Sequence, residues 1–194
     1  GTLMATLALG SSQAISAGLF YLVHSTLMTA AFFLFADLIA NQREEAGDHM
    51  VVTSAMKDRR TLGILFFFGA TAFAGLPPFS GFISKIWILE SSLAQGASAS
   101  LWPVLLGAGL LMLTALSRAG SKFFWRQSGD RPHEYRADRV RFGVVCAMLL
   151  TSVALSVLAQ PLMDYLTVTA EHLQDPQRYV ETVMSTTRAL KEGH

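Results

Sequence analysis

One lysine, Lys85, lies in apolar sequence where its side chain could bind and release protons. No residue from Thr61 to Ser84 is charged, and a second apolar run follows Lys85. An ionisable side chain in such a stretch is costly in a membrane and usually has a function there. Burial disfavours the charged form of a lysine, so its amine could exchange a proton near neutral pH. The alternative is structural, because Lys85 lies only seven residues after Pro78 and its side chain could extend to the membrane surface.

The helical pattern breaks just before this lysine. The sequence GLPP at 75–78 interrupts an apolar run, which restarts through SG at 80–81. Proline disrupts a helix interior, and glycine readily adopts the conformation that ends a helix. Irregular backbone at membrane depth is tolerated only where it is buried in protein or lines a watery cavity. We therefore predict a broken helix beside a hydrated polar pocket, as in transporters. The residues predicted at the break are Gly75, Pro77, Pro78 and Gly81.

A histidine, His24, lies about half-way along an earlier apolar segment. Histidine titrates near neutral pH and can pass a proton between its two ring nitrogens, which makes His24 a second candidate for a proton relay. The alternative is a neutral histidine that hydrogen-bonds between packed helices. Hydroxyl side chains near the two ionisable residues form a candidate polar path: Ser25, Thr26, Thr29, Ser80 and Ser84.

Apolar segments of membrane-spanning length fill most of the chain. A spanning helix needs about 20 apolar residues. Charged residues make up 15% of the sequence, against about 25% in soluble domains. We therefore predict an all-α, polytopic transmembrane helix bundle over residues 1–166, with about five complete spans. After the end of one helix at 1–9, the predicted helices cover 13–40, 61–76, 79–95, 101–125 and 142–166.

The two ends of the chain are expected to differ from this bundle. In a tail at 167–194, Asp175 and Pro176 are typical of the start of a helix, and apolar residues follow at helical spacing. We expect a short amphipathic helix there, on the membrane surface or against a neighbouring subunit. The first residues are apolar and lack the basic segment of a signal peptide, so we expect the chain to be the C-terminal part of a longer protein.

The sequence lacks the common patterns of redox, nucleotide and metal sites. It contains no G-x-G-x-x-G, no G-x-x-x-x-G-K-[ST], no C-x-x-C pair and no histidine cluster of the metal-binding type. The single cysteine, Cys146, lies in an apolar run and is expected to pack as a small apolar residue. A formal net charge of +1 argues against a nucleic-acid surface. We therefore expect no cofactor, no metal, no nucleic-acid partner and no enzymatic activity of this chain alone.

Several stretches resemble one family of membrane proteins. GLPPFSGFISK at 75–85 resembles the broken-helix signature of the proton-translocating antiporter-like subunits. These subunits occur in respiratory complex I, in membrane-bound hydrogenases and in multisubunit Na⁺/H⁺ antiporters of the Mrp type. YLVHSTLMTAAFFLFADLI at 21–39 resembles the histidine-bearing helix of that family. SRAGSKFFW at 117–125 and DPQRYVETVM at 175–184 are similar to the D subunits of the Mrp/Pha antiporters, so the resemblance covers nearly the whole chain.

This resemblance implies a fold and roles for individual residues. The fold would be a bundle of fourteen transmembrane helices with two inverted repeats, of which this chain is the C-terminal part. Lys85 would match the lysine of the second broken helix, and His24 the histidine of the central hydrophilic axis. The family often has a second lysine four residues after that histidine, where this chain has Met28. Water, Thr29 or another residue would have to replace it, and the family's essential glutamate and first-repeat lysine would lie upstream.

The function implied is proton conduction in a multisubunit Na⁺ or K⁺/H⁺ antiporter. The chain would cross the bacterial plasma (inner) membrane several times, with other membrane subunits as partners, and His24 would pass protons to Lys85 through water. A second hypothesis is a proton-pumping subunit of NADH-quinone oxidoreductase or of a membrane-bound hydrogenase. A third is a purely structural membrane subunit, in which Lys85 only extends to the membrane surface.

Overall fold

The described part of the chain is helical, with short connecting turns and no strand. The computed structural model describes residues 1–42, 59–125, 138–175 and 184. The amphipathic helix predicted after Asp175 therefore lies outside the described residues. The prediction of an all-α membrane bundle is confirmed. In chain order the elements are α1 (Thr2–Leu9), α2 (Ser12–Gln42), α3 (Arg59–Ala74), α4 (Ser80–Ala94), α5 (Ser98–Gly120), the π-helical turn η2 (Ser121–Trp125), α6 (Arg139–Val157) and α7 (Ala159–Gln174).

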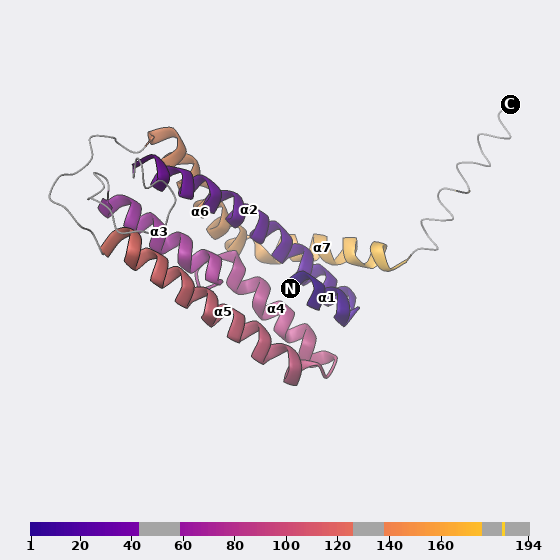
Figure 1. The fold of residues 1–194 in the computed structure, drawn as a ribbon. Coiled ribbons are helices and arrows are strands. Elements are labelled where there is room, and N and C mark those ends of the chain that lie inside the picture. Colours follow the sequence, from indigo (N-terminus) through magenta and orange to yellow (C-terminus); the bar gives the residue numbers. More distant parts are fainter. Residues whose placement is uncertain (43–58, 126–137, 176–183, 185–194) are drawn as a thin grey trace, which may run out of the picture.

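Helices α3 and α4 are shorter than the other long helices of the described bundle and follow one another in space. Among the described residues, three helices are long and apolar enough to cross a membrane by themselves, at Ser12–Asn41, Ser98–Phe124 and Arg139–Val157. With 16 and 15 residues, α3 and α4 are each shorter than the roughly 20 residues that a crossing needs. Figure 1 shows α4 continuing in the direction of α3, while α5 returns alongside both. The segments predicted at 61–76 and 79–95 are thus each too short to cross a membrane alone, and they follow one another in the same direction.

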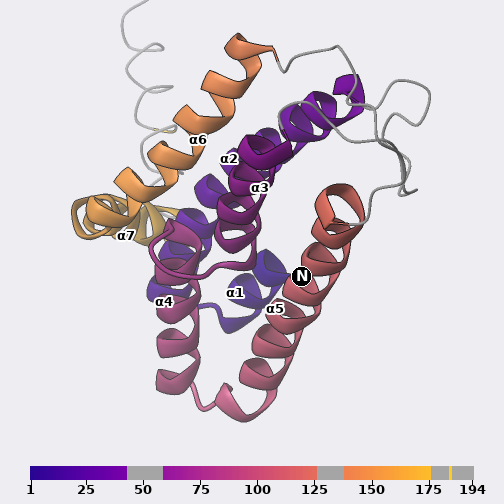
Figure 2. The same cartoon turned by 90° about the vertical axis from the view of Figure 1, so that its left-hand side faces the viewer.

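Helix α2 lies at the centre of the bundle. It is 31 residues long and packs against α1, α3, α4, α6 and α7. Figure 2 shows α5 and α6 on opposite sides of the pair formed by α2 and α3. A side chain in the middle of α2 can therefore contact helices from both the first and the last part of the chain.

Polar contacts hold α2 near both of its ends. Close to its C-terminal end, Asp37 forms an ion pair with Arg141 in the first turn of α6. At its N-terminal end, the Ser12 hydroxyl donates to Gln174 Oε1 at 2.6 Å. The amide of Gln174, the last residue of α7, also donates to the carbonyl of Gly10 at 2.5 Å. The position of α2 is thus set by contacts more than 20 residues apart along the helix.

The last predicted span is two helices rather than one. The sequence pattern predicts a single helix over 142–166, but α6 ends at Val157 and α7 begins two residues later, after Leu158. Pro161 explains the difference, because in a continuous helix its ring would clash with the carbonyl of Val157, four residues earlier. In the first turn of α7, residues have no intrahelical acceptor for their N–H groups, so the lack of an N–H on Pro161 costs no hydrogen bond. Figure 1 shows the resulting change of direction, and α7 runs across the boundary between residues 166 and 167, where the sequence placed the start of the tail.

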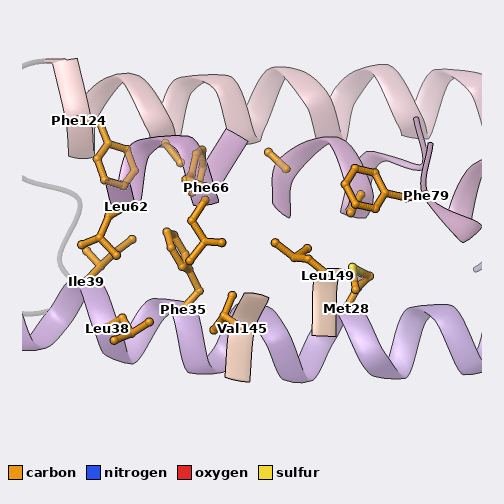
Figure 3. Close-up of a cluster of buried hydrophobic side chains, with 14 residues drawn as sticks. Met28, Phe35, Leu38, Ile39, Leu62, Phe66, Phe79, Phe124, Val145 and Leu149 are labelled. Atoms are coloured by element: carbon orange, nitrogen blue, oxygen red, sulfur yellow. The ribbon is translucent and has the colours of Figure 1, made fainter. Parts of the chain in front are cut away.

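A buried apolar cluster fills the space between α2, α3, η2 and α6. The ring of Phe66 on α3 has centroid distances of 5.9 Å to Phe35 and 5.5 Å to Phe124. Met28, at the position where the family often has a lysine, is only 1% exposed in this cluster. The side chains labelled in Figure 3 are Met28, Phe35, Leu38, Ile39, Leu62, Phe66, Phe79, Phe124, Val145 and Leu149. They fill the α3 half of the bundle with apolar side chains.

We expect Met28→Lys to destabilise the protein strongly. The new ammonium group would lie in the apolar cluster beside Phe79 and Leu149 without an opposite charge, which costs on the order of 3 kcal/mol or more. Met28→Leu is the matched control, because it keeps the volume and the apolar surface and should cost less than about 1.5 kcal/mol. The measurement is the thermal unfolding midpoint of the full-length protein purified in detergent. Equal midpoints for the two variants would contradict the apolar environment assigned to Met28.

Candidate functional site

The candidate site begins where α3 ends. Gly75 has a φ of 73°, a left-handed conformation that favours glycine. Its N–H donates to the carbonyl of Ala72 at 3.1 Å, and the N–H of Leu76 donates to the carbonyl of Thr71 at 3.0 Å. This pair of hydrogen bonds is a Schellman motif, which satisfies carbonyls that the end of a helix otherwise leaves without partners. The break itself covers residues 75–79, and Gly81 already lies in the first turn of α4.

Lys85 hydrogen-bonds to the end of α3. Its Nζ donates to the carbonyl of Ala74, the last residue of that helix, at 2.5 Å. A cation is favoured at this end, because the helix dipole places partial negative charge there. A Cβ atom on Gly75 would lie 2.7 Å from Nζ, so glycine at this position also leaves room for the lysine. The half-buried side chain of Lys85 therefore points back to the break between α3 and α4.

His24 lies where α2, α4 and α6 meet. Its side chain is only 3% exposed, and its Nδ1 lies 2.8 Å from the hydroxyl oxygen of Ser80 at the start of α4. That oxygen is 3.0 Å from the hydroxyl oxygen of Ser152 on α6. A Cβ atom on Gly81 would clash with Nε2 of the imidazole, so this glycine permits the close approach of the ring to α4. The three polar side chains form one buried hydrogen-bonded group.

A cavity of about 290 Å³ adjoins Lys85. Tyr21, one helical turn before His24, lines this cavity, and its ring centroid lies 6.3 Å from that of the imidazole. Tyr21 thus lines the same cavity as Lys85 and lies near His24. The sequence predicts a polar pocket beside the break, but most of this lining is apolar. The residues of the lining include Ala5, Phe73, Leu101, Val104, Leu105, Ala108 and Met112.

Three hydroxyl residues of the predicted path lie elsewhere on α2. Ser25, Thr26 and Thr29 line a shallow surface depression with Ala30 and Phe33. Neither Lys85 nor His24 is among the described residues that line it. Thr26 and Thr29 are exposed, and the Ser25 hydroxyl donates to the carbonyl of Leu22 in its own helix. The structure therefore places these three side chains on a different face of α2 from His24.

The remaining two hydroxyl residues of the predicted path are buried in α4. Ser80 contacts His24 directly, as described above. Ser84 donates to the carbonyl of Gly81 at 2.9 Å, within its own helix. Of the predicted path, Ser80 is thus the residue that the structure brings to the imidazole. No group of three metal-ligating side chains is arranged to hold an ion in the described ranges.

Two residues near the site were not singled out from the sequence. Tyr21 could have been found, because residues three apart on a helix share a face and Tyr21 is three residues before His24. Ser152 is a hydroxyl residue within an apolar run, and buried hydroxyls need hydrogen-bond partners. That signal marks Ser152 as a residue to examine, but its contact with Ser80 depends on how α6 packs against α2 and α4.

The sequence also matches a known transmembrane family. Residues 1–114 match the family described as NADH:quinone oxidoreductase/Mrp antiporter, TM. The chain belongs to this family. The matched region contains α1 to α4 and most of α5, and hence His24, the break and Lys85. The predicted membership in the antiporter-like family is confirmed.

Relatives within the NADH:quinone oxidoreductase/Mrp antiporter family include antiporter and redox-complex subunits. The chain is 33% identical to the probable K⁺/H⁺ antiporter D subunit of Rhizobium meliloti, over 97% of the chain and 40% of that relative. It is 28% identical to the Na⁺/H⁺ antiporter D subunit of Bacillus subtilis, over 95% of the chain and 37% of the relative. Identity to the NADH-quinone oxidoreductase N subunit of Mycobacterium bovis is 27%, over 77% of the chain and 29% of that relative. The chain thus spans about two fifths or less of these relatives, and its predicted similarity to the antiporter D subunits is confirmed.

We expect Gly75→Ala to displace the Lys85 amine from the carbonyl of Ala74. The added Cβ would lie 2.7 Å from Nζ, and the left-handed backbone would add a cost of roughly 1–2 kcal/mol. Gly96→Ala is the matched control, because Gly96 has a similar φ of 69° but no atom within 4 Å of the added Cβ. Labelling of the full-length protein with an amine-reactive reagent, followed by mass spectrometry, should show faster modification of Lys85 in Gly75→Ala only. Equal labelling rates in both variants would show that Gly75 does not control the lysine position.

Proposed function

We propose that this chain carries part of the proton path of a monovalent cation/H⁺ antiporter subunit, with Lys85 and His24 as its proton-binding groups. The observation that carries the proposal is the position of the Lys85 amine, which lies at the break between α3 and α4. His24 is buried against Gly81, about one helical turn before Lys85 on α4. Ionisable groups inside a membrane bundle commonly form proton relays. Similarity to antiporter D subunits over 95–97% of the chain supports an antiporter over a redox-driven pump.

The electrostatic interaction between the two groups would couple their protonation. Two nearby positive charges destabilise each other, so the pair holds one added proton more readily than two. When a proton arrives at His24, release of a proton from Lys85 becomes more favourable. When Lys85 is neutral, the imidazolium N–H bond breaks and a new N–H bond forms on the amine. The transfer needs direct hydrogen-bond reach or one bridging water.

Tyr21 and the cavity provide the connection between the two groups. The cavity of about 290 Å³ exceeds the roughly 30 Å³ that one water molecule occupies in liquid water. Tyr21 lines it and neighbours the imidazole, so its hydroxyl group and water would bridge His24 to Lys85. This assignment replaces Thr29, which is exposed on another face of α2. The apolar cluster around Met28 disfavours a proton path in the opposite direction along α2.

We also propose that the whole protein exchanges H⁺ for Na⁺ or K⁺ as one subunit of a membrane complex in the bacterial plasma membrane. The printed names of the relatives, which are subunits of K⁺/H⁺ and Na⁺/H⁺ antiporters, support this proposal. The apolar surface of α5 supports a lipid or protein environment, because Val104, Leu110 and Leu111 are all more than half exposed. Neighbouring membrane subunits and lipid are the expected partners.

We expect Lys85→Ala to reduce proton-coupled cation transport about 100-fold or more, which is a typical cost of removing a general acid–base group. Lys122→Ala is the control, because Lys122 is exposed on η2. The measurement is the collapse of a pH gradient on addition of Na⁺ or K⁺ to membrane vesicles that contain the full-length protein in its complex. Native gels would check that both variants assemble. Normal transport by an assembled Lys85→Ala complex would support the structural alternative instead.

Purification of the native complex should separate the antiporter from the redox-driven pump. We expect the full-length protein to co-purify with other membrane subunits and without flavin or iron–sulfur absorption. The weaker similarity to the NADH-quinone oxidoreductase N subunit makes the redox complex the second candidate. Stoichiometric flavin and iron–sulfur signals in the purified complex would favour that candidate.

A further inference from the structure

We propose that Ser152 is a positioning residue that keeps His24 hydrogen-bonded in both its neutral and its protonated form. Ser152 would act through Ser80, by a reversal of the two hydrogen bonds that connect the three side chains. This inference rests on the proposed function only in so far as His24 gains and loses a proton during transport.

The geometry that carries the inference is a chain of three polar atoms from three helices. Nδ1 of His24 lies 2.8 Å from Ser80 Oγ, which lies 3.0 Å from Ser152 Oγ. The direct separation of Ser152 Oγ from Nδ1 is 3.5 Å, so Ser80 is the better placed partner of the imidazole. Both serines are 0% exposed. Bulk water is therefore not in contact with their hydroxyl groups.

These two serines differ from the other fully or almost fully buried hydroxyl residues that the structure describes. The others donate to a backbone carbonyl of their own helix: Thr6 to Leu3, Ser16 to Ser12, Ser84 to Gly81, Ser91 to Ile88, and Ser92 to Leu89. Such local hydrogen bonds satisfy a hydroxyl group without any tertiary partner. The hydroxyl groups of Ser80 and Ser152 instead face each other and the imidazole. Their hydrogen bonds therefore connect α2, α4 and α6.

In the neutral form of His24, the hydrogen bonds run from Ser152 to the ring. Ser152 donates its O–H to Ser80, and Ser80 donates its O–H to Nδ1, which is an acceptor. Because Nδ1 accepts from Ser80 in this form, Nε2 carries the proton of the neutral imidazole.

In the protonated form, both hydrogen bonds reverse. Both ring nitrogens of an imidazolium are donors, so Nδ1–H now donates to Ser80 Oγ. The single O–H of Ser80 must then find another acceptor, and Ser152 Oγ is 3.0 Å away. A hydroxyl group can donate or accept, so Ser152 fits both forms of the site, and its own O–H would then turn to a carbonyl one turn earlier in α6. Ser80 is the first residue of α4 and has no such helical carbonyl before it. Without the hydroxyl of Ser152, protonation of His24 would leave the Ser80 donor buried and unsatisfied, which is costly.

The charged surroundings of His24 do not supply that acceptor. On α4 the facing ionisable group is Lys85, which is a donor. On α2 itself the neighbour is Tyr21. The described ionisable groups of the other helices packed on α2 lie at helix starts, in the middle of α6 or on exposed positions of α7: Arg59 and Arg60 on α3; Arg139, Arg141 and the half-buried Cys146 on α6; and Asp164, Tyr165, Glu171 and His172 on α7.

A pair of variants of almost identical shape tests the role of the hydroxyl group. Ser152→Thr keeps the hydroxyl and Ser152→Val lacks it, while both add similar bulk. We would record ¹⁵N NMR spectra of the full-length, histidine-labelled protein in membranes across a range of pH, with the His24 signal identified by its loss in His24→Gln. In Ser152→Val the imidazolium signal should appear about one pH unit lower than in Ser152→Thr, a roughly tenfold loss of proton affinity. Ser152→Ala repeats the comparison with wild type without added bulk.

The control is Ser91→Ala, which removes a hydroxyl that is equally buried but bonded only within α4. It should leave the titration of His24 unchanged. The inference is overturned if His24 titrates at the same pH in Ser152→Val and Ser152→Ala as in the wild type and Ser152→Thr. This holds whatever the transport assay shows. Normal transport by Lys85→Ala would overturn the proposed function but leave this spectroscopic result intact, so the two failures are distinguishable.

Discussion

A helix that stops inside a membrane leaves carbonyl groups that lipid cannot satisfy, and the structure of this chain depends on how α3 meets that requirement. Two carbonyls receive backbone N–H groups in the Schellman motif at Gly75 and Leu76. The carbonyl of Ala74 receives the amine of Lys85. A lysine amine has N–H donors in both its charged and its neutral form. The contact that completes the helix end can therefore persist while Lys85 exchanges a proton.

The break also separates two chemically different halves of the bundle. Along α3, the space between the helices is filled by aromatic and aliphatic side chains, including Met28 where a second lysine is common in the family. Along α4, the same central helix presents His24 and Tyr21 to buried serines and to the cavity at Lys85. Gly75 allows Lys85, and Gly81 allows His24, to approach the backbone at the boundary. One irregular segment thus ends a helix and makes space for two ionisable groups.

How well the sequence predicted these features depends on whether their causes are local. The break was predictable, because glycine and proline act on their own backbone and on the turn beside them. Lys85 and His24 stood out as ionisable residues in apolar sequence. The contact of Ser152 with Ser80, and the outward orientation of Thr26 and Thr29, depend on the rotation of helices against each other, which a nearly uniform apolar sequence specifies weakly. The sequence also contains Pro161 near the end of the predicted helix at 142–166, but only the structure shows that α6 ends before this proline.

The contacts at the two ends of α2 limit how this site can move. With Asp37 bound to Arg141 and Ser12 bound to Gln174, α2 cannot turn about its axis without loss of polar contacts at both ends. Rearrangement during a proton transfer would then involve side-chain rotations, namely those of the Lys85 side chain and of the Ser80 and Ser152 hydroxyl groups. Side-chain rotations can take picoseconds to nanoseconds, whereas collective helix motions take microseconds to milliseconds. A proton step that uses only these side-chain rotations can be much faster than a collective motion of the helices.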